Sequence, residues 1–140
     1  PLVIVNRKLP DVIETRMMEL FETRLNLADA PMSQAELSKA VIAADVLVRT
    51  VTDRIDSTIL SQAGDNLKLI ASFGTGIDHI DFAAAKKLNI TVTNTPSVLT
   101  EDTTGRTMGL ILAVPRRLSE GARLIRAKNG TVGGQLGNRI

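Results

Sequence analysis

The 140-residue sequence contains no cysteine, tryptophan or tyrosine, only one histidine and three phenylalanines. Without cysteine, disulfides and thiolate chemistry are excluded, and one histidine leaves no His/Cys cluster for a metal ion. The scarcity of aromatic rings argues against stacking on bases, sugars or a flavin ring. No apolar run reaches the ~20 residues that cross a bilayer, and no charged leader precedes an apolar segment. We therefore expect a cytoplasmic protein with no metal site and no membrane partner.

The charge of the chain is nearly balanced, with a formal net charge of +2. This small excess does not indicate a nucleic-acid partner. A basic cluster in residues 116–128 includes Glu120 and is typical of a solvated helix face. Apolar residues make up 44% and charged residues 23% of the chain, which predicts a globular domain with a core of its own.

Strand and helix patterns alternate along the sequence. Strands are expected at 2–5, 25–27, 45–50, 67–73 and 90–93, and helices at 12–24, 34–43, 53–63, 82–88, 97–114 and 116–128. The boundary signals are Asp11 and Asp81 as N-caps, Ser33 with Glu36 as a capping box, Gly64 as a C-cap and Pro115 as a helix break. Alternation of this kind predicts an α/β fold with five parallel strands in doubly wound order.

Two neighbouring strands end in small, polar residues. Gly74-Thr75-Gly76 follows the fourth expected strand, and Asn94-Thr95-Pro96 follows the fifth. Ligands of parallel sheets bind in the crevice beyond the carboxyl ends of the strands. A turn without bulky side chains lets backbone N–H groups approach an anion, although the glycines could also serve only a tight turn.

Two other doubly wound classes do not fit the residues at the strand ends. A phosphoacceptor receiver needs acidic residues after the first strand and an Asp after the third, where this chain has Asn6-Arg7 and Arg49-Thr50. A flavodoxin needs a hydroxyl-rich phosphate loop after the first strand and aromatic rings around the flavin. Residues 6–10, NRKLP, do not supply that loop.

Three segments carry a specific family resemblance. They are DVLVRTVTDRID at 45–56, LKLIASFGTGIDHIDFAAAKKLNITVTNTPSVLTED at 67–102 and TMGLILAVPRRLSEGARLI at 107–125. This sequence resembles the amino-terminal part of the D-isomer-specific 2-hydroxyacid dehydrogenases, and within them it is most similar to the glyoxylate and hydroxypyruvate reductases. The resemblance implies a three-layered, flavodoxin-like substrate-binding domain at 1–128 and a glycine-rich tail or linker at 129–140. The family's Rossmann domain, which binds NAD or NADP, would lie outside this sequence.

The resemblance also implies roles for individual residues. Thr75 and Gly76 would offer backbone N–H groups to the carboxylate of a small 2-oxo or 2-hydroxy acid, and Thr75 would also lie beside the coenzyme. Arg49 matches the family's arginine near the acidic group of the substrate, although it could instead pair with Asp53 or with neighbouring C-terminal carbonyls. Thr103 matches a position that touches the coenzyme, and could equally be an ordinary residue of a helical first turn.

No catalytic residue is predicted within this chain. The family's acid/base is a His paired with a Glu and assisted by an Arg, and all three belong to the part that the sequence does not contain. His79 matches a turn position that caps or faces solvent, and Asn94 is expected to tie the turn to backbone. The chain departs from the family at Thr104-Gly105-Arg106, where Ala-Asp is usual after the threonine.

The expected function follows from the resemblance. The complete protein would reduce a small 2-oxo acid, such as glyoxylate or hydroxypyruvate, to a D-2-hydroxy acid, whereas the isolated chain would be inactive. The alternative is a flavodoxin-like module that only binds or dimerises. That alternative depends on apolar residues of the 97–114 segment, which favour a homodimer: Val98, Leu99, Leu110, Ile111 and Leu112.

Overall fold

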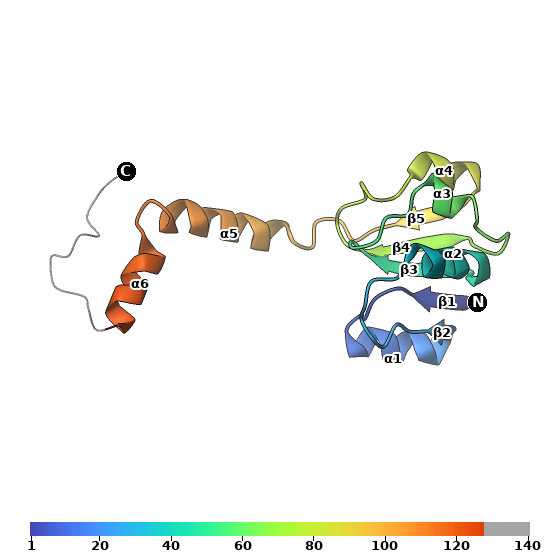
Figure 1. Ribbon diagram of the computed structural model, residues 1–140, viewed down its shortest axis with the longest axis horizontal. Coiled ribbons are helices and arrows are strands. Elements are labelled where there is room, and N and C mark those ends of the chain that lie inside the picture. Colours follow the sequence, from blue (N-terminus) through green and yellow to red (C-terminus); the bar gives the residue numbers. More distant parts are fainter. Residues whose placement is uncertain (128–140) are drawn as a thin grey trace. The chain divides into compact units, whose positions relative to one another are not determined.

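The computed structural model, which describes residues 1–127, contains one parallel sheet with strand order β2-β1-β3-β4-β5 (Figure 1). The strands are β1 (Leu2–Val5), β2 (Glu22–Arg24), β3 (Val46–Thr50), β4 (Leu69–Phe73) and β5 (Thr91–Thr93). The helices are α1 (Asp11–Leu20), α2 (Gln34–Ala43), α3 (Ser57–Leu60), α4 (Phe82–Lys87), α5 (Thr100–Ala113) and α6 (Leu118–Arg126). The strand order and parallel pairing confirm the predicted doubly wound, five-stranded, flavodoxin-like α/β fold.

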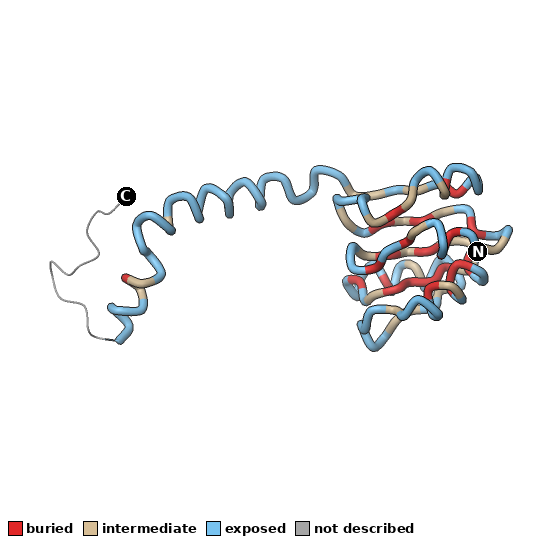
Figure 2. The backbone as a smooth tube through the Cα atoms, turned by 45° about the horizontal axis from the view of Figure 1, so that its top comes forward, coloured by how far each residue is buried: buried red, intermediate tan, exposed pale blue. Residues whose placement is uncertain are grey.

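Successive residues of the strands pack on opposite faces of the sheet, because side chains alternate along a strand. Leu47 and Ile70 belong to a large core that also contains residues of α2, α3 and α4. Val3 and Val5 belong to a smaller cluster on the other face, together with Met17 of α1. These clusters make three layers, and Figure 2 shows the buried residues concentrated along the strands. The sheet therefore holds the loops at its carboxyl edge on a rigid base.

Two predicted helix starts are confirmed by their hydrogen bonds. At α2, the Ser33 hydroxyl accepts from the Glu36 N–H at 3.3 Å, and a Glu36 carboxylate oxygen accepts from the Ser33 N–H at 2.7 Å. This is the reciprocal capping box that the spacing predicts. At α4, the Asp81 carboxylate accepts from the Ala84 N–H at 2.9 Å. The four orphan N–H groups of a helix start make such caps valuable.

Two helix predictions are wrong at their ends. The helix expected at 12–24 ends at Leu20, and the chain turns to extended backbone at Phe21 so that β2 can pair with β1. Asp11 is the first residue of that helix and Pro10 its N-cap. The helix expected at 53–63 is reduced to α3, because Asp56 caps it and the preceding residues form a loop. Gly64 is therefore no C-cap; Ser61 occupies that position.

The chain divides into two compact units, residues 1–97 and residues 98–140. Helices α5 and α6 belong to the second unit, and α5 ends at Ala113, shortly before Pro115 as predicted. The expected tail at 129–140 lies outside the described residues. Within residues 1–127, no helix is long and apolar enough to cross a membrane.

Candidate functional site

The site begins at the turn after β4, where Gly74 and Gly76 differ in how much space surrounds them. A Cβ on Gly74 would lie 2.4 Å from Cγ1 of Val51, in the loop after β3. Such an approach leaves no ordinary van der Waals space, so glycine lets the two loops touch. A Cβ on Gly76 would meet nothing within 4 Å. Gly74 therefore serves packing, whereas Gly76 borders open space.

The turn is braced by the segment that leaves β5. The Thr95 N–H donates to the Gly74 oxygen at 3.1 Å, and the Thr75 hydroxyl donates back to the Thr95 oxygen at 3.2 Å. The Asn94 side-chain amide donates to the Thr75 oxygen at 2.9 Å. This last contact confirms that Asn94 ties the turn to backbone. The three bonds fix the turn through its carbonyls and one hydroxyl, and leave its N–H groups unused.

The N–H groups of Thr75 and Gly76 donate no hydrogen bond within residues 1–127. Both residues are exposed and follow the carboxyl end of a parallel strand. Backbone donors that are held in place and face open space are suited to an anion, because binding it needs little reorganisation. The structure thus brings together the two turn residues that the sequence predicted for a carboxylate.

Arg49 lies beneath this edge, with a relative exposure of 0%. It pairs with Ser72 across β3 and β4, and Nη2 of its guanidinium donates to the main-chain oxygen of Asp53 at 2.7 Å. Among the described residues, Nε and Nη1 find no hydrogen-bond partner. Burial lowers the pKa of Arg49 to about 10, against the attraction of Asp53. The guanidinium is therefore charged at neutral pH, and two of its three nitrogens donate no hydrogen bond within residues 1–127.

Two further buried polar atoms have no hydrogen-bond partner in the described part of the chain. The Ser72 hydroxyl is one, and Nε2 of His79 is the other. Burial first, and the charge of Arg49 second, lower the pKa of His79. His79 is half-buried and its main-chain oxygen accepts from Ile55 at 2.8 Å. The environment thus keeps this imidazole neutral at neutral pH.

A pH experiment tests the lowered pKa of His79. The folded state resists protonation of this residue, whereas the unfolded chain takes up the proton as the pH falls past about 6.5, so acid destabilises the fold through it. Wild type should lose more unfolding free energy than His79→Gln between about pH 7.5 and about pH 5.5, as measured by urea denaturation. Equal losses in the two proteins would contradict the assignment.

The described residues do not by themselves form a dinucleotide site. Such a site needs a strand, a glycine-rich turn and a helix N-terminus in direct succession, and in residues 1–127 the Gly74–Gly76 turn leads into a further turn before α4. Thr103 lies in the first turn of α5, where its N–H donates to the Leu99 oxygen, and its side chain is exposed. Thr75 and Thr103 belong to different units. Their contacts with a coenzyme stay predictions.

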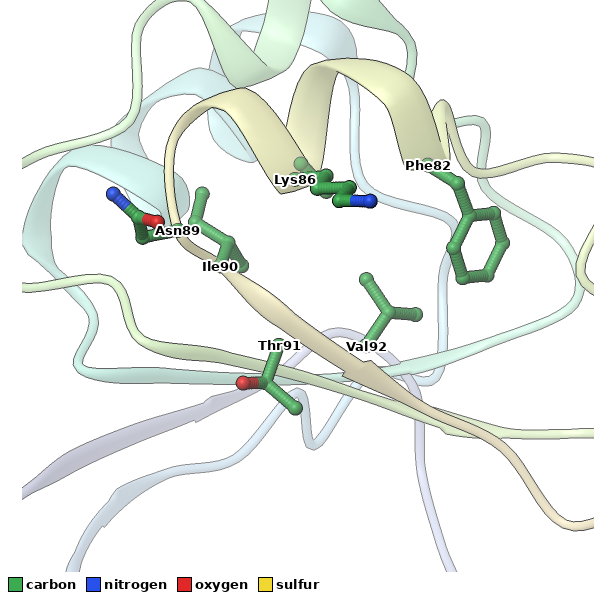
Figure 3. Close-up of a pocket in the computed structure, with 7 residues that line it drawn as sticks. Phe82, Lys86, Asn89, Ile90, Thr91 and Val92 are labelled. Atoms are coloured by element: carbon green, nitrogen blue, oxygen red, sulfur yellow. The ribbon is translucent and has the colours of Figure 1, made fainter.

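Two cavities of the first unit lie away from the turn. One of about 400 Å³ follows the edge strand β5 and is bordered by Phe82 and Lys86 of α4 and by Val92 of β5 (Figure 3). Another, of about 270 Å³, contains His79 together with Asp56 and Asp81, whose carboxylates would repel an anion. Neither contains Arg49, Thr75 or Gly76. No group of acidic or histidine side chains in the described part could hold a metal ion.

Sequence reasoning named Asp53 as a possible partner of Arg49, which donates to its main-chain oxygen, but missed Asn6 and its bond to the Asp53 carboxylate. Asn6 and Asp53 are buried polar residues, with relative exposures of 0% and 5%. The Asn6 side-chain amide donates to Oδ2 of Asp53, although the two residues are far apart in sequence. The available signal was an amide directly after a buried strand, which the sequence alone does not distinguish from a turn residue.

Comparison with known proteins gives consistent matches. The family model described as D-isomer specific 2-hydroxyacid dehydrogenase, catalytic domain, matches residues 3–107. A glyoxylate reductase from Thermofilum pendens is 39% identical over 127 residues, which cover 90% of this chain and 37% of that protein. One from Korarchaeum cryptofilum is 37% identical over 126 residues, covering 90% and 38% respectively. A solved structure from Polaromonas sp. JS6 66, described as NAD-binding, has a TM-score of 0.82 at 31% identity and covers 97% of this chain and 44% of that one.

Proposed function

Because this chain belongs to the D-isomer specific 2-hydroxyacid dehydrogenase family, we propose that its first unit holds a small 2-oxo or 2-hydroxy acid for an NAD(P)-dependent oxidoreductase. The observation that carries the proposal is the pair of unused N–H groups at Thr75 and Gly76. The chain spans 37–38% of the two glyoxylate reductases named above. The activity of a complete protein is therefore part of the proposal.

In this proposal the two N–H groups bind the carboxylate and fix the direction of the neighbouring carbonyl carbon. Holding a reactant in one orientation is itself a large part of catalysis. Arg49 adds positive charge from beneath, in a setting where burial strengthens its field. Glyoxylate and hydroxypyruvate are the proposed substrates, since both are short 2-oxo acids. NADH or NADPH would supply the hydride.

The proposal assigns no proton transfer to this chain. His79 is its only histidine, and Nε2 of that side chain is buried. A general acid must reach the atom it protonates. The purified 140-residue chain should therefore bind the dianion oxalate, measured by calorimetry, and should not oxidise NADH or NADPH in the presence of glyoxylate. A complete glyoxylate reductase serves as the positive control. Steady-state oxidation of NADH or NADPH by the chain itself would overturn the proposal that this chain binds the acid but does not catalyse its reduction.

A second proposal concerns self-association through α5. No residue of α5 is buried, and Leu110, Ile111 and Leu112 are 63%, 57% and 63% exposed. An apolar surface of this kind is typical of an interaction site. We propose that two copies pair through it. Light scattering at high concentration should show a dimer that Ile111→Glu reduces to a monomer, whereas a monomeric wild type would refute the pairing.

A further inference from the structure

A buried amide–carboxylate pair connects the end of β1 to the loop after β3. Asn6 follows β1 directly, Asp53 lies three residues beyond β3, and the Asn6 side-chain amide donates to Oδ2 of Asp53. The Thr52 hydroxyl also donates to that oxygen, at 3.4 Å. Burying a carboxylate is costly unless hydrogen bonds compensate. The buried position of the Asp53 carboxylate therefore calls for an explanation.

Asn6 uses every polar group that it has. Its Oδ1 accepts from the Thr50 N–H at 3.1 Å, and its own N–H donates to the Val48 oxygen at 2.9 Å. Its main-chain oxygen accepts from the Asn26 side-chain amide at 2.7 Å. The side chain of Asn6 thus joins the end of β3 to the loop after β3, and its main-chain oxygen adds the loop after β2. Fully satisfied buried networks of this kind impose a single arrangement.

Asp53 also binds Arg49, through its main-chain oxygen. Its carboxylate is bound by Asn6, and its main-chain oxygen accepts from Nη2 of Arg49 at 2.7 Å. The loop from Thr50 to Asp53 is therefore closed at both ends. That loop also carries Val51, whose Cγ1 lies against Gly74 of the turn. Moving Asp53 would displace the guanidinium and the support of the turn together.

We propose that Asn6 and Asp53 are positioning residues of the acid-binding site, acting as a clamp that sets Arg49 beneath the Gly74–Gly76 turn. The inference rests on the proposed function. A purely structural network would be expected to use the donors of a buried guanidinium. Within residues 1–127, however, Nε and Nη1 of Arg49 and the hydroxyl of its register partner Ser72 have no hydrogen-bond partner. The hydrogen bonds of Asn6 and Asp53 fix the position of the Arg49 guanidinium and leave its Nε and Nη1 donors for a ligand. Preorganised charge of this kind is what a binding site requires.

The test follows the Nε–H signal of Arg49 by ¹⁵N NMR in the ligand-free chain, together with oxalate affinity. Asp53→Ala should shift or broaden that signal and weaken oxalate binding about tenfold or more. Asp53→Asn keeps an oxygen for Asn6 and the main-chain oxygen for Arg49, so it should preserve both the signal and the affinity. Asn66→Ala, at an exposed position, is the matched control.

Two variants of Asn6 keep the test decisive. Asn6→Ala should reproduce the effect of Asp53→Ala, and if it does not fold, Asn6→Ser replaces it, because a serine hydroxyl is too short to reach Asp53. An Arg49 signal and affinity that stay unchanged in Asp53→Ala and in the Asn6 variant would overturn the clamp, even if both variants lose stability. Absence of oxalate binding to wild type would instead refute the proposed function. The clamp would then still be tested by whether the Arg49 Nε–H signal of the ligand-free chain changes in the variants.

Discussion

Replacing Arg49 by methionine should weaken oxalate binding by about 30-fold without destabilising the chain. For any two unit charges about 8 Å apart at an effective dielectric of about 20, the attraction is about 2 kcal/mol, which corresponds to that factor. Arg49 is buried, and the pairing of β3 with β4 places it beside Ser72, two residues before the turn. Isothermal titration of Arg49→Met with oxalate measures the loss.

The stability of Arg49→Met has an expected sign as well. The pKa of Arg49 lies at about 10 because burial outweighs the attraction of Asp53, so the folded environment as a whole disfavours the charge. Methionine fills similar space without a charge; leaving the Asp53 oxygen without its donor costs about 1–3 kcal/mol, which removal of the buried charge offsets. We expect a urea midpoint equal to that of wild type or higher. If Arg49 only supported the fold, Arg49→Met would lower the urea midpoint.

The matched control for Arg49 is Arg54→Met. Arg54 lies five residues further along the chain and is exposed. Its replacement changes the net charge by the same amount, but solvent and salt screen an exposed charge. Oxalate affinity should change little. Equal weakening by both variants would show that net charge matters and that the location of Arg49 does not.

Replacing Gly76 by alanine should remove most of the oxalate affinity and leave the fold intact. A Cβ at this position meets no atom within 4 Å, so alanine costs no packing and can stabilise the chain by about 0.5 kcal/mol through the unfolded state. The added methyl would stand beside the N–H that is proposed to bind the carboxylate. We expect at least a tenfold loss of affinity by calorimetry, with an unchanged or slightly raised urea midpoint.

Two other glycines show whether the effect of Gly76→Ala is specific. Gly105→Ala also adds a methyl to open space and should raise helix stability by about 1 kcal/mol without affecting oxalate. Gly74→Ala should destabilise by about 1–3 kcal/mol, because its methyl meets Val51, and Val51→Ala should relieve the strain. Full oxalate affinity in Gly76→Ala would exclude the turn as the carboxylate site.

The central strands could be predicted from sequence because their signals are local. Residues 45–50 and 67–73 are apolar runs bounded by polar residues, and the structure places β3 and β4 within them. The edge strand β2 could not be placed in the same way, and the strand expected at 25–27 is wrong, because those residues follow β2. Glu22, Thr23 and Arg24 have no apolar alternation, and they are extended because they pair with Leu2, Val3 and Ile4. Tertiary pairing overrides weak local preference there.

The candidate site was predictable in part for a related reason. The Gly74–Gly76 turn and the support from Asn94 are visible as short motifs after consecutive strands, and the structure brings them together. The burial of Arg49 and its bond to Asp53 depend on how α3 begins, which the expected helix at 53–63 misplaced. The bond between Asn6 and Asp53 joins loops that are distant in sequence. No periodicity or motif reports such a contact.

A titration of the ¹⁵N-labelled chain with oxalate, followed by amide and arginine side-chain NMR, tests the central claim most directly. The account predicts saturable shifts at the N–H groups of Thr75 and Gly76 and at Nε of Arg49, with little change along β5 and α4. Shifts confined to the basic residues of α6 or to the cavity beside His79, or no shifts at all, would contradict an acid-binding site at the turn after β4.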